Sequence, residues 1–415
     1  MKKKEPDNKA DILADKDRGE QPTSMEPLLI SETSRHRGLL QDIALELATK
    51  AAGFRRSLPV KMQVSLADMV RTMNCYYSNL IEGHDTHPIS AERAMNNDYS
   101  RDPKKRDLQY EARAHITVQK WIDEGNLKGT AFQVSSLKET HKRFCDLLPA
   151  DMLWAKDDKT GEKIAPLIPG ALREVDVKVG SHVACSPGAL PRFLDRFESV
   201  YGKLGKSEAI LASAAAHHRL LWIHPFLDGN GRVARLMSHA VFLDVLDTGG
   251  LWSIARGLAK NVKAYKAHLQ NCDLQRRNDL DGRGNLSEEA LADFTHFFLS
   301  VCLDQVTFME GLMQPDHLRV RIMTWAAEET KLGSLPAQAG QLLEALLYRG
   351  ELPRGDIPAL LNVGDRQARR VIGALQEKQV LSADTQKSPL YLKFSATLSS
   401  RWMPGLFPEK TDVDE

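Results

Sequence analysis

Apolar residues recur three and four positions apart through most of this 415-residue chain. That spacing places them on one side of an α-helix, so it predicts a mostly helical body that reaches about residue 332. The pattern is clear in the segments 37–53, 64–83 and 108–125. A chain of this length exceeds what one compact core usually holds, and we expect two or three domains.

Two segments depart from the helical pattern. Residues 170–183 alternate Val175, Val177 and Val179 with polar residues between glycines, which predicts a short exposed β-hairpin. Past Gly333 the sequence predicts a helix, a short helix, a turn, a helix and two small strands. That order is typical of a winged helix-turn-helix, with 363–378 as its recognition helix.

Charge and cysteine content exclude several classes of protein. The 56 Lys and Arg nearly balance 55 Asp and Glu, so any binding to nucleic acid must be local. The five cysteines have no paired spacing and indicate reduced thiols of a cytoplasmic protein. Residues 1–30 are charged and poor in apolar side chains, so we expect disorder there. No apolar run is long enough to cross a bilayer, and we expect no membrane association.

The stretch HPFLDGNGRVAR, residues 224–235, is unfavourable for helix formation, because it contains a proline, two glycines and two arginines near a helix start. Gly229, Asn230 and Gly231 precede a helix whose unpaired N–H groups make a cradle for an anion. Arg232 and Arg235 lie on nearly one face of its first turn, and both guanidinium groups are expected to reach the same anion. So many donors indicate a diphosphate or triphosphate.

Two further side chains of this stretch complete a reaction site. Asp228 precedes the cradle and offers a hard oxygen ligand for the Mg²⁺ that accompanies a nucleoside triphosphate. His224 is the nearby group able to take a proton near neutral pH. Phe226 is expected to anchor the loop in the core. A lone histidine at a helix end is commonly a structural cap, but a structural loop has no reason to combine all these groups.

The stretch resembles the signature of the Fic/Doc family, His-x-Phe-x-(Asp/Glu)-Gly-Asn-(Gly/Lys)-Arg-x-x-Arg, at every fixed position. The resemblance implies transfer of AMP from ATP to a Ser, Thr or Tyr hydroxyl of a target protein, or of the chain itself. It implies His224 as the base, Asp228 as the Mg²⁺ ligand and Arg235 at the γ phosphate. Residues 229–231 and Arg232 would hold the α and β phosphates. Gly231 resembles the AMP-transferring form, whereas Doc-type kinases carry lysine there.

Upstream, the stretch YYSNLIEGHD places Ser78 and Glu82 four apart on one helix face, with Gly83 as the terminating residue. Without further information, the stretch is interpreted as an ordinary helix end exposed to solvent. It is similar to the inhibitory motif of the family, (Ser/Thr)-x-x-x-Glu-(Gly/Asn), and the resemblance implies that Glu82 pairs with Arg235 and takes the place of the γ phosphate.

Other assignments also rest on the resemblance. The hairpin at 170–183 corresponds to the flap that holds a target segment by strand addition, although a plain surface hairpin is the alternative. Asn261 resembles an asparagine near the nucleoside, with an exposed polar side chain as the alternative. The helical body from about 37 to 316 resembles the Fic domain with its N-terminal extension.

We divide the chain into a disordered tail (1–30), an N-terminal helical region carrying the inhibitory helix (31–130), a Fic catalytic core (131–332), a winged helix-turn-helix (333–396) and a second tail (397–415).

Several alternatives stay open. A loop containing Asp279, Asp281 and Gly284 imitates a calcium-binding EF-hand, but it has Arg283 and Ala290 where ligands belong, so we reject calcium. His217 and His218 point to different faces of their helix, which disfavours a shared metal.

A different class of function is also open, in which the protein is a regulator that binds DNA through its C-terminal unit. The predicted recognition helix carries polar side chains that can contact phosphates and base edges: Arg366, Gln367, Arg369 and Arg370. Removal of AMP by the same loop and phosphate transfer are enzymatic alternatives, and a homodimer is left open.

Overall fold

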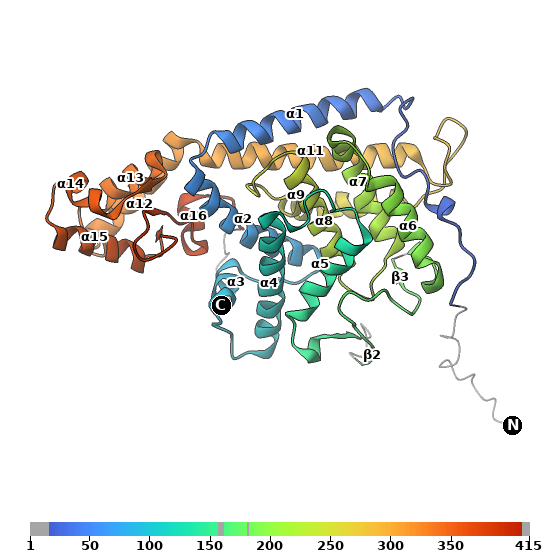
Figure 1. The fold of residues 1–415 in the computed structure, drawn as a ribbon, viewed down its shortest axis with the longest axis horizontal. Coiled ribbons are helices and arrows are strands. Elements are labelled where there is room, and N and C mark those ends of the chain that lie inside the picture. Colours follow the sequence, from blue (N-terminus) through green and yellow to red (C-terminus); the bar gives the residue numbers. More distant parts are fainter. Residues whose placement is uncertain (1–15, 157–161, 181, 409–415) are drawn as a thin grey trace.

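The computed structural model describes residues 16–156, 162–180 and 182–408, and it confirms a mostly helical protein (Figure 1). Two long helices, α1 (Arg37–Arg56) and α11 (Glu288–Met313), lie side by side along one edge. Beneath them, α7 (Lys206–Ile223) packs against α6 (Leu190–Tyr201), α8 (Asn230–Val245) and α11. Residues 209–220 of α7 are all buried. Most of them are apolar or small, and the exceptions, His217, His218 and Arg219, have hydrogen-bond partners inside the fold.

The other layer of the body is built around α2 (Val60–Ile81), which packs against α4 (Pro103–Trp121), α3 (Pro88–Met95) and α9 (Ile254–Lys260). Nearly all of its residues from 65 to 81 are buried. The helix α5 (Val134–Asp146) packs on α4 and α8, while α10 (Val262–Asn271) follows α9 and lies on α11. A single π-helical turn, Ile122–Asn126, extends α4. No helix in the described part of the chain is long and apolar enough to span a membrane.

Two short antiparallel hairpins project from this body. The pair β1 (Trp154–Lys156) and β2 (Lys163–Pro166) was not predicted. The predicted hairpin at 170–183 is confirmed only at its tip, where β3 (Lys178–Val179) pairs with β4 (His182–Val183). Its first half is a loop because the buried Arg173 side chain donates to the carbonyl oxygens of Val175, Cys185 and His224.

The C-terminal unit has the predicted order of elements. It contains α13 (Ala339–Arg349), α14 (Ile357–Leu361), α15 (Asp365–Glu377), β6 (Leu381–Ser382) and β7 (Leu390–Leu392), with an additional strand β5 (Glu351–Leu352). The sheet order is β5-β7-β6, all antiparallel. The helix α12 (Pro315–Lys331) joins it to α11 and packs on α13. Arg366, Arg369 and Arg370 are exposed on α15, and DNA binding stays a prediction.

The prediction of disorder for residues 1–30 is wrong for residues 16–30; residues 1–15 lie outside the described residues. This segment contains a 3₁₀ turn, Pro22–Met25, and follows the surface beside α6. Asp17 pairs with Arg192 at 2.6 Å, Arg18 pairs with Asp176 at 2.7 Å, and Met25 is fully buried. Composition failed here because the charges have partners on the folded body, which local sequence does not reveal.

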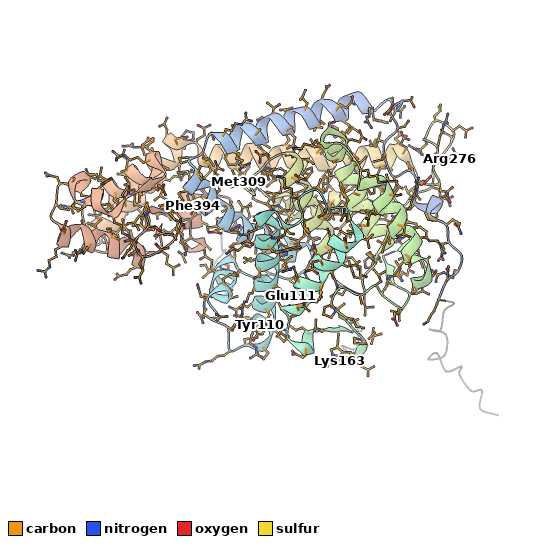
Figure 2. The ribbon with its side chains drawn as sticks, viewed as in Figure 1. Tyr110, Glu111, Lys163, Arg276, Met309 and Phe394 are labelled. Atoms are coloured by element: carbon orange, nitrogen blue, oxygen red, sulfur yellow. The ribbon has the colours of Figure 1, made fainter. Side chains whose placement is uncertain are left out.

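The prediction of a tail at 397–415 is also wrong as far as the described residues go. A 3₁₀ turn, Ala396–Leu398, leads into α16 (Ser399–Trp402). Trp402 is 1% exposed and makes edge contacts with Trp325 and Phe394. Phe394 lies where the C-terminal unit meets the helical body (Figure 2). The apolar side chains of this short segment therefore close that boundary.

We expect Trp402→Ala to lower the free energy of unfolding by about 3–5 kcal/mol, because it removes a fully buried indole and leaves a cavity. Urea unfolding followed by circular dichroism measures the change. Ser400→Ala, at an exposed position in the same short helix, should stay within about 0.5 kcal/mol of wild type. A Trp402→Ala protein as stable as the Ser400→Ala control would contradict the packing described here.

Candidate active site

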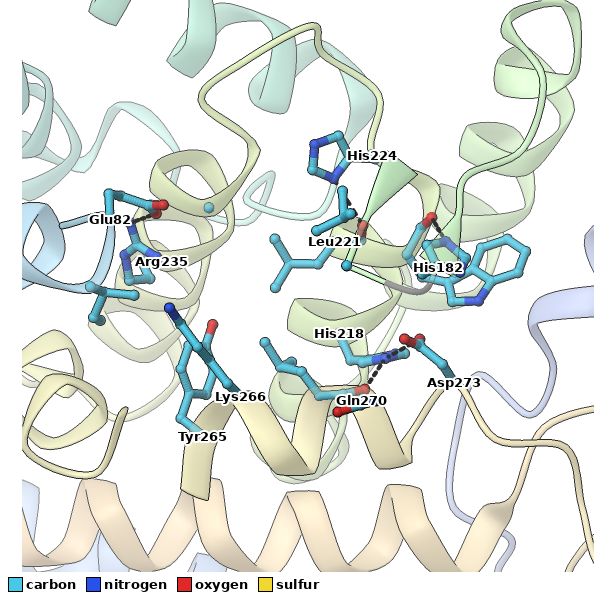
Figure 3. A pocket seen from close by; sticks show the side chains of 16 residues that line it. Glu82, His182, His218, Leu221, His224, Arg235, Tyr265, Lys266, Gln270 and Asp273 are labelled. Atoms are coloured by element: carbon cyan, nitrogen blue, oxygen red, sulfur yellow. Dashed lines mark hydrogen bonds and ion pairs between the residues drawn. The ribbon is translucent and has the colours of Figure 1, made fainter. Parts of the chain in front are cut away.

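A cavity of about 580 Å³ opens beside the loop 224–235 (Figure 3). Its walls come from the end of α2, the β3–β4 hairpin, the end of α7, the start of α8 and one face of α10. The lining residues are Ile81, Glu82, Val179, Gly180, His182, His218, Leu221, Trp222, His224, Gly231, Arg235, Tyr265, Lys266, Leu269, Gln270 and Asp273. The cavity thus brings together the predicted base, one predicted arginine and the predicted inhibitory glutamate.

His224 ends α7 in the left-handed conformation, with φ of 52°, and Pro225 prevents the helix from continuing. Its Nδ1 lies 3.3 Å from the carbonyl oxygen of Leu221 (Figure 3). A carbonyl only accepts, so Nδ1 carries the hydrogen and Nε2 keeps its lone pair. Burial lowers the pKa of His224 to about 4. The imidazole is therefore neutral at pH 7 and able to accept a proton through Nε2.

The loop that follows His224 is anchored by contacts within the core. Phe226 is 1% exposed, as predicted, and its ring stacks on His141 with centroids 4.1 Å apart. The side-chain amide of Asn230 accepts from the backbone N–H of Phe226 at 3.0 Å and donates to its carbonyl oxygen at 2.8 Å. Asn230 therefore closes the loop with its side chain, and it can meet an anion only through its backbone.

The N-terminus of α8 has the geometry of an anion cradle. Gly229 precedes it with φ of 81°, a conformation that favours glycine. The first backbone bond runs from the N–H of Val233 to the carbonyl oxygen of Gly229. The N–H groups of residues 230–232 are thereby left at the positive end of the helix, where phosphate oxygens bind.

Asp228 is exposed beside this helix end, and its Oδ1 accepts from the N–H of Gly229 at 2.6 Å. Among the described residues, no group of three or more His, Cys, Asp or Glu side chains is placed to hold a metal. This donor set fits Mg²⁺, which commonly takes one carboxylate and completes its shell with phosphate oxygens and water.

Arg235 binds the end of α2, as the resemblance implies. Its Nε donates to Ser78 Oγ at 2.8 Å. Its Nη2 donates to Glu82 Oε1 at 2.5 Å (Figure 3). Gly83 ends α2 with φ of 87°. Burial opposes ionisation of Glu82, but the charge and hydrogen bond of Arg235 outweigh it and lower the pKa of Glu82. A Cβ on residue 231 would overlap Glu82 Oε1, so Gly231 is what permits this approach.

Arg232 and Arg235 have different carboxylate partners in this structure, and their expected binding of one phosphate ligand stays a prediction. Its side chain is buried, lies outside the lining of the cavity and donates from Nη2 to Glu111 Oε2 at 3.0 Å. Its guanidinium also lies over the ring of Phe144, 5.1 Å from the centroid. The spacing of the two arginines gave no sign of this partner, because the buried carboxylate of Glu111 comes from α4.

Asn261 is exposed at the junction of α9 and α10, where its amide donates to the carbonyl oxygen of Gly257 at 2.9 Å. It does not line the cavity, whereas Tyr265 and Lys266 on the first turns of α10 do. Figure 3 shows both side chains directed from α10 toward the cavity. The sequence contained one sign of these two residues, which is the helical spacing of side chains along α10. That spacing indicates a site only once the cavity is known.

The alternative metal sites have structural partners instead. His217 contacts Ser238 Oγ and the Tyr265 hydroxyl, and His218 contacts Asp273. Asp281 accepts from Ser287 Oγ and from backbone N–H groups at the start of α11 and in its own loop. These acceptor roles agree with the rejection of an EF-hand.

We expect the imidazole of His224 to titrate with a midpoint near pH 4 in the ligand-free protein, because burial disfavours its charged form. Nitrogen-15 NMR of the histidine side chains measures this midpoint. Since the unfolded chain takes up the proton near pH 6.5, this group should make the protein less stable as pH falls from 6.5 to 4. A midpoint at or above 6.5 would contradict the buried, neutral state of His224.

Residues 136–242 match a protein-family model described as the Fic/DOC family. A protein adenylyltransferase Fic of Nematostella vectensis is 28% identical over 193 residues, which cover 45% of this chain and 40% of that protein. One of Drosophila grimshawi is 25% identical over 170 residues, covering 40% and 32%. This chain therefore spans less than half the length of these two relatives.

Among solved structures, a Fic family protein of Desulfovibrio desulfuricans aligns with a TM-score of 0.49 and 15% identity, covering 88% of this chain and 98% of that one. The residues that match the Fic/DOC family model, 136–242, include His224, the N-terminus of α8 and Arg235.

Proposed function

We propose that this protein is an adenylyltransferase that transfers AMP from ATP to a hydroxyl group of a target protein. The observation that carries the proposal is the meeting of a neutral His224, an anion cradle and a carboxylate-bound Arg235 around one cavity. The names of the two curated relatives support the same reaction. The residues that match the family model include His224, the start of α8 and Arg235, whereas Glu82 lies outside them.

In the proposed reaction, the N–H groups at the start of α8 bind phosphate oxygens of ATP. Asp228 would hold Mg²⁺, which supplies charge neutralisation for the triphosphate when bound. Nε2 of His224 takes the proton of the acceptor hydroxyl, whose oxygen then bonds to the α phosphorus. The bond from that phosphorus to the bridging oxygen breaks, and pyrophosphate leaves with the electron pair.

The β3–β4 hairpin is suited to present the acceptor. Val179, Gly180 and His182 line the cavity, and His182 Nε2 donates to the carbonyl oxygen of Trp222 at 2.8 Å, two residues before the base. This bond fixes the hairpin against the end of α7. An exposed strand edge binds extended peptides through their backbone, so we propose that a target segment pairs here with its hydroxyl directed at His224.

Incubation with ATP labelled at the α phosphate, beside ATP labelled at the γ phosphate, tests the reaction. AMP transfer requires label in protein from the first alone, with the mass increase of an AMP group in the intact protein. We expect His224→Ala to lower this labelling by at least about 10²- to 10⁴-fold, with little change in ATP binding, because the phosphate contacts remain. The exposed His317→Ala serves as the control and should label like wild type. Label from γ alone would indicate a kinase instead.

Glu82 is proposed as a brake because it holds the guanidinium that a γ phosphate would use. We expect Glu82→Gln to increase self-labelling by AMP, since the charge is lost while size and helix propensity are kept. Glu82→Gly should do the same, although it also weakens the end of α2 by about 1 kcal/mol. Adding Arg235→Ala should erase the gain. Glu377→Gln, an exposed change at the end of α15, is the matched control.

A Glu82→Gln protein that labels no faster than wild type would show that packing of α2, and not the contact with Arg235, restrains the enzyme. If neither variant gains AMP transfer but Glu82→Gln loses the ability to remove AMP from a modified target, Glu82 acts in the reverse reaction. The proposal that Glu82 inhibits AMP transfer would then be wrong.

A further inference from the structure

A second carboxylate holds the other arginine of the loop. Glu111 lies on α4 within the helical body (Figure 2), and its side chain is 13% exposed. Its Oε2 accepts from Arg232 Nη2 at 3.0 Å and lies 2.8 Å from Nδ1 of His84. We call these three residues the Glu111 cluster. It joins α4, α8 and the segment that follows α2.

Arg232 depends on this carboxylate for its position. Its Nε is buried and has no hydrogen-bond partner among the described residues, and the ring of Phe144 covers the guanidinium. Burial opposes the charge of Arg232, and the negative charge of Glu111 offsets that cost and raises the pKa of Arg232. A buried guanidinium without such a partner would be strongly destabilising, so Glu111 fixes the direction of this side chain.

His84 connects the same carboxylate to the proposed brake. It follows Glu82 and Gly83, and its side chain is 41% exposed. The hydrogen bond to Glu111 raises the pKa of His84; burial and Arg232 on α8 act against this, while Glu82 adds to it. These are the charged groups that face His84 from α2, α4 and α8. Protonated His84 therefore ties the residue after the inhibitory helix to α4.

We propose that Glu111 is a second restraint on the phosphate-binding arginines. It holds Arg232 away from the cavity, and through protonated His84 it holds the end of α2 in place. Withdrawal of Glu82 frees Arg235 alone, and full phosphate binding requires Arg232 to leave Glu111. This regulatory role rests on the proposed function, because it concerns the same ATP site.

The test compares full-length variants in a Glu82→Gln background. Glu111→Gln removes the charge while keeping the size of the side chain, and His84→Ala removes only the link to α2. The matched control is Glu139→Gln, which breaks a pair with Arg143 on the surface of α5. Calorimetry measures the dissociation constant of ATP, and labelling from α-labelled ATP measures the rate of AMP transfer.

We expect Glu111→Gln to tighten ATP binding and to speed self-labelling by at least about twofold, the lower range of coupling between neighbouring groups. His84→Ala should speed labelling as well. Because the pKa of His84 is raised above 6.5, labelling by the Glu82→Gln protein should rise with pH above 6.5 as His84 loses its proton, and His84→Ala should remove that rise. Loss of a merely structural contact would leave the pH profile unchanged. Glu139→Gln should alter neither measurement.

The outcomes separate the two proposals. If the Glu82→Gln protein transfers AMP, but a folded Glu111→Gln variant neither binds ATP more tightly nor labels faster, the restraint is wrong. If Glu111→Gln does not fold, an unchanged rate and pH profile for His84→Ala overturn it. If ATP binding tightens as expected but no variant transfers AMP, the proposed function fails and the restraint on Arg232 stands.

Discussion

The charge of Arg235 is the constraint on which the arrangement of this site depends. Its side chain is 4% exposed, and a guanidinium so far removed from water needs an anion within hydrogen-bond distance. In this structure that anion is Glu82, with Ser78 satisfying Nε. The contact of Glu82 with Arg235 therefore determines where the end of α2 lies. Gly231 permits this contact, because a Cβ at residue 231 would overlap Glu82 Oε1.

The position of α2 is determined from its other side by the C-terminal unit. The hydroxyl of Tyr77 donates to the carbonyl oxygen of Leu406 at 3.0 Å, and the N–H of Phe394 donates to Ser65 Oγ at 3.1 Å. Tyr77 immediately precedes Ser78. A movement of α2 that withdraws Glu82 must therefore either break the hydrogen bonds of Tyr77 and Ser65 or move their partners together with α2. The segment that contains Phe394 and Leu406 is in this way linked through α2 to Arg235 in the loop at 224–235.

The sequence predicted features whose causes are local. Helices followed from apolar spacing, and the start of α8 followed from the glycine before it, which has a φ of 81°. What it did not predict depends on partners far away in the chain. The pairing of Arg232 with Glu111 was not predicted, because Glu111 lies 121 residues earlier. Trp402 was placed in a tail because its neighbours Trp325 and Phe394 come from other elements.

The pairing of Glu82 with Arg235 is intermediate between these cases. Helical spacing placed Ser78 and Glu82 on one face, but only the resemblance to the family indicated which cation they meet. The folded chain brings them together across 157 and 153 residues. Local sequence thus indicated how each side of the contact is arranged. It did not indicate that Glu82 and Arg235 meet.

The two arginine–carboxylate pairs differ in how easily a ligand can exchange with them. The side chain of Glu82 is 36% exposed and borders the cavity, so an entering phosphate can approach Arg235 while water solvates the departing carboxylate. The side chain of Glu111 is 13% exposed, and Arg232 lies under Phe144, outside the cavity. Separating that pair in place would leave two charges poorly solvated, at a cost of several kcal/mol. Under the proposed function, a phosphate competes with Glu82 at the edge of the cavity, whereas Arg232 must first leave a buried carboxylate outside the cavity.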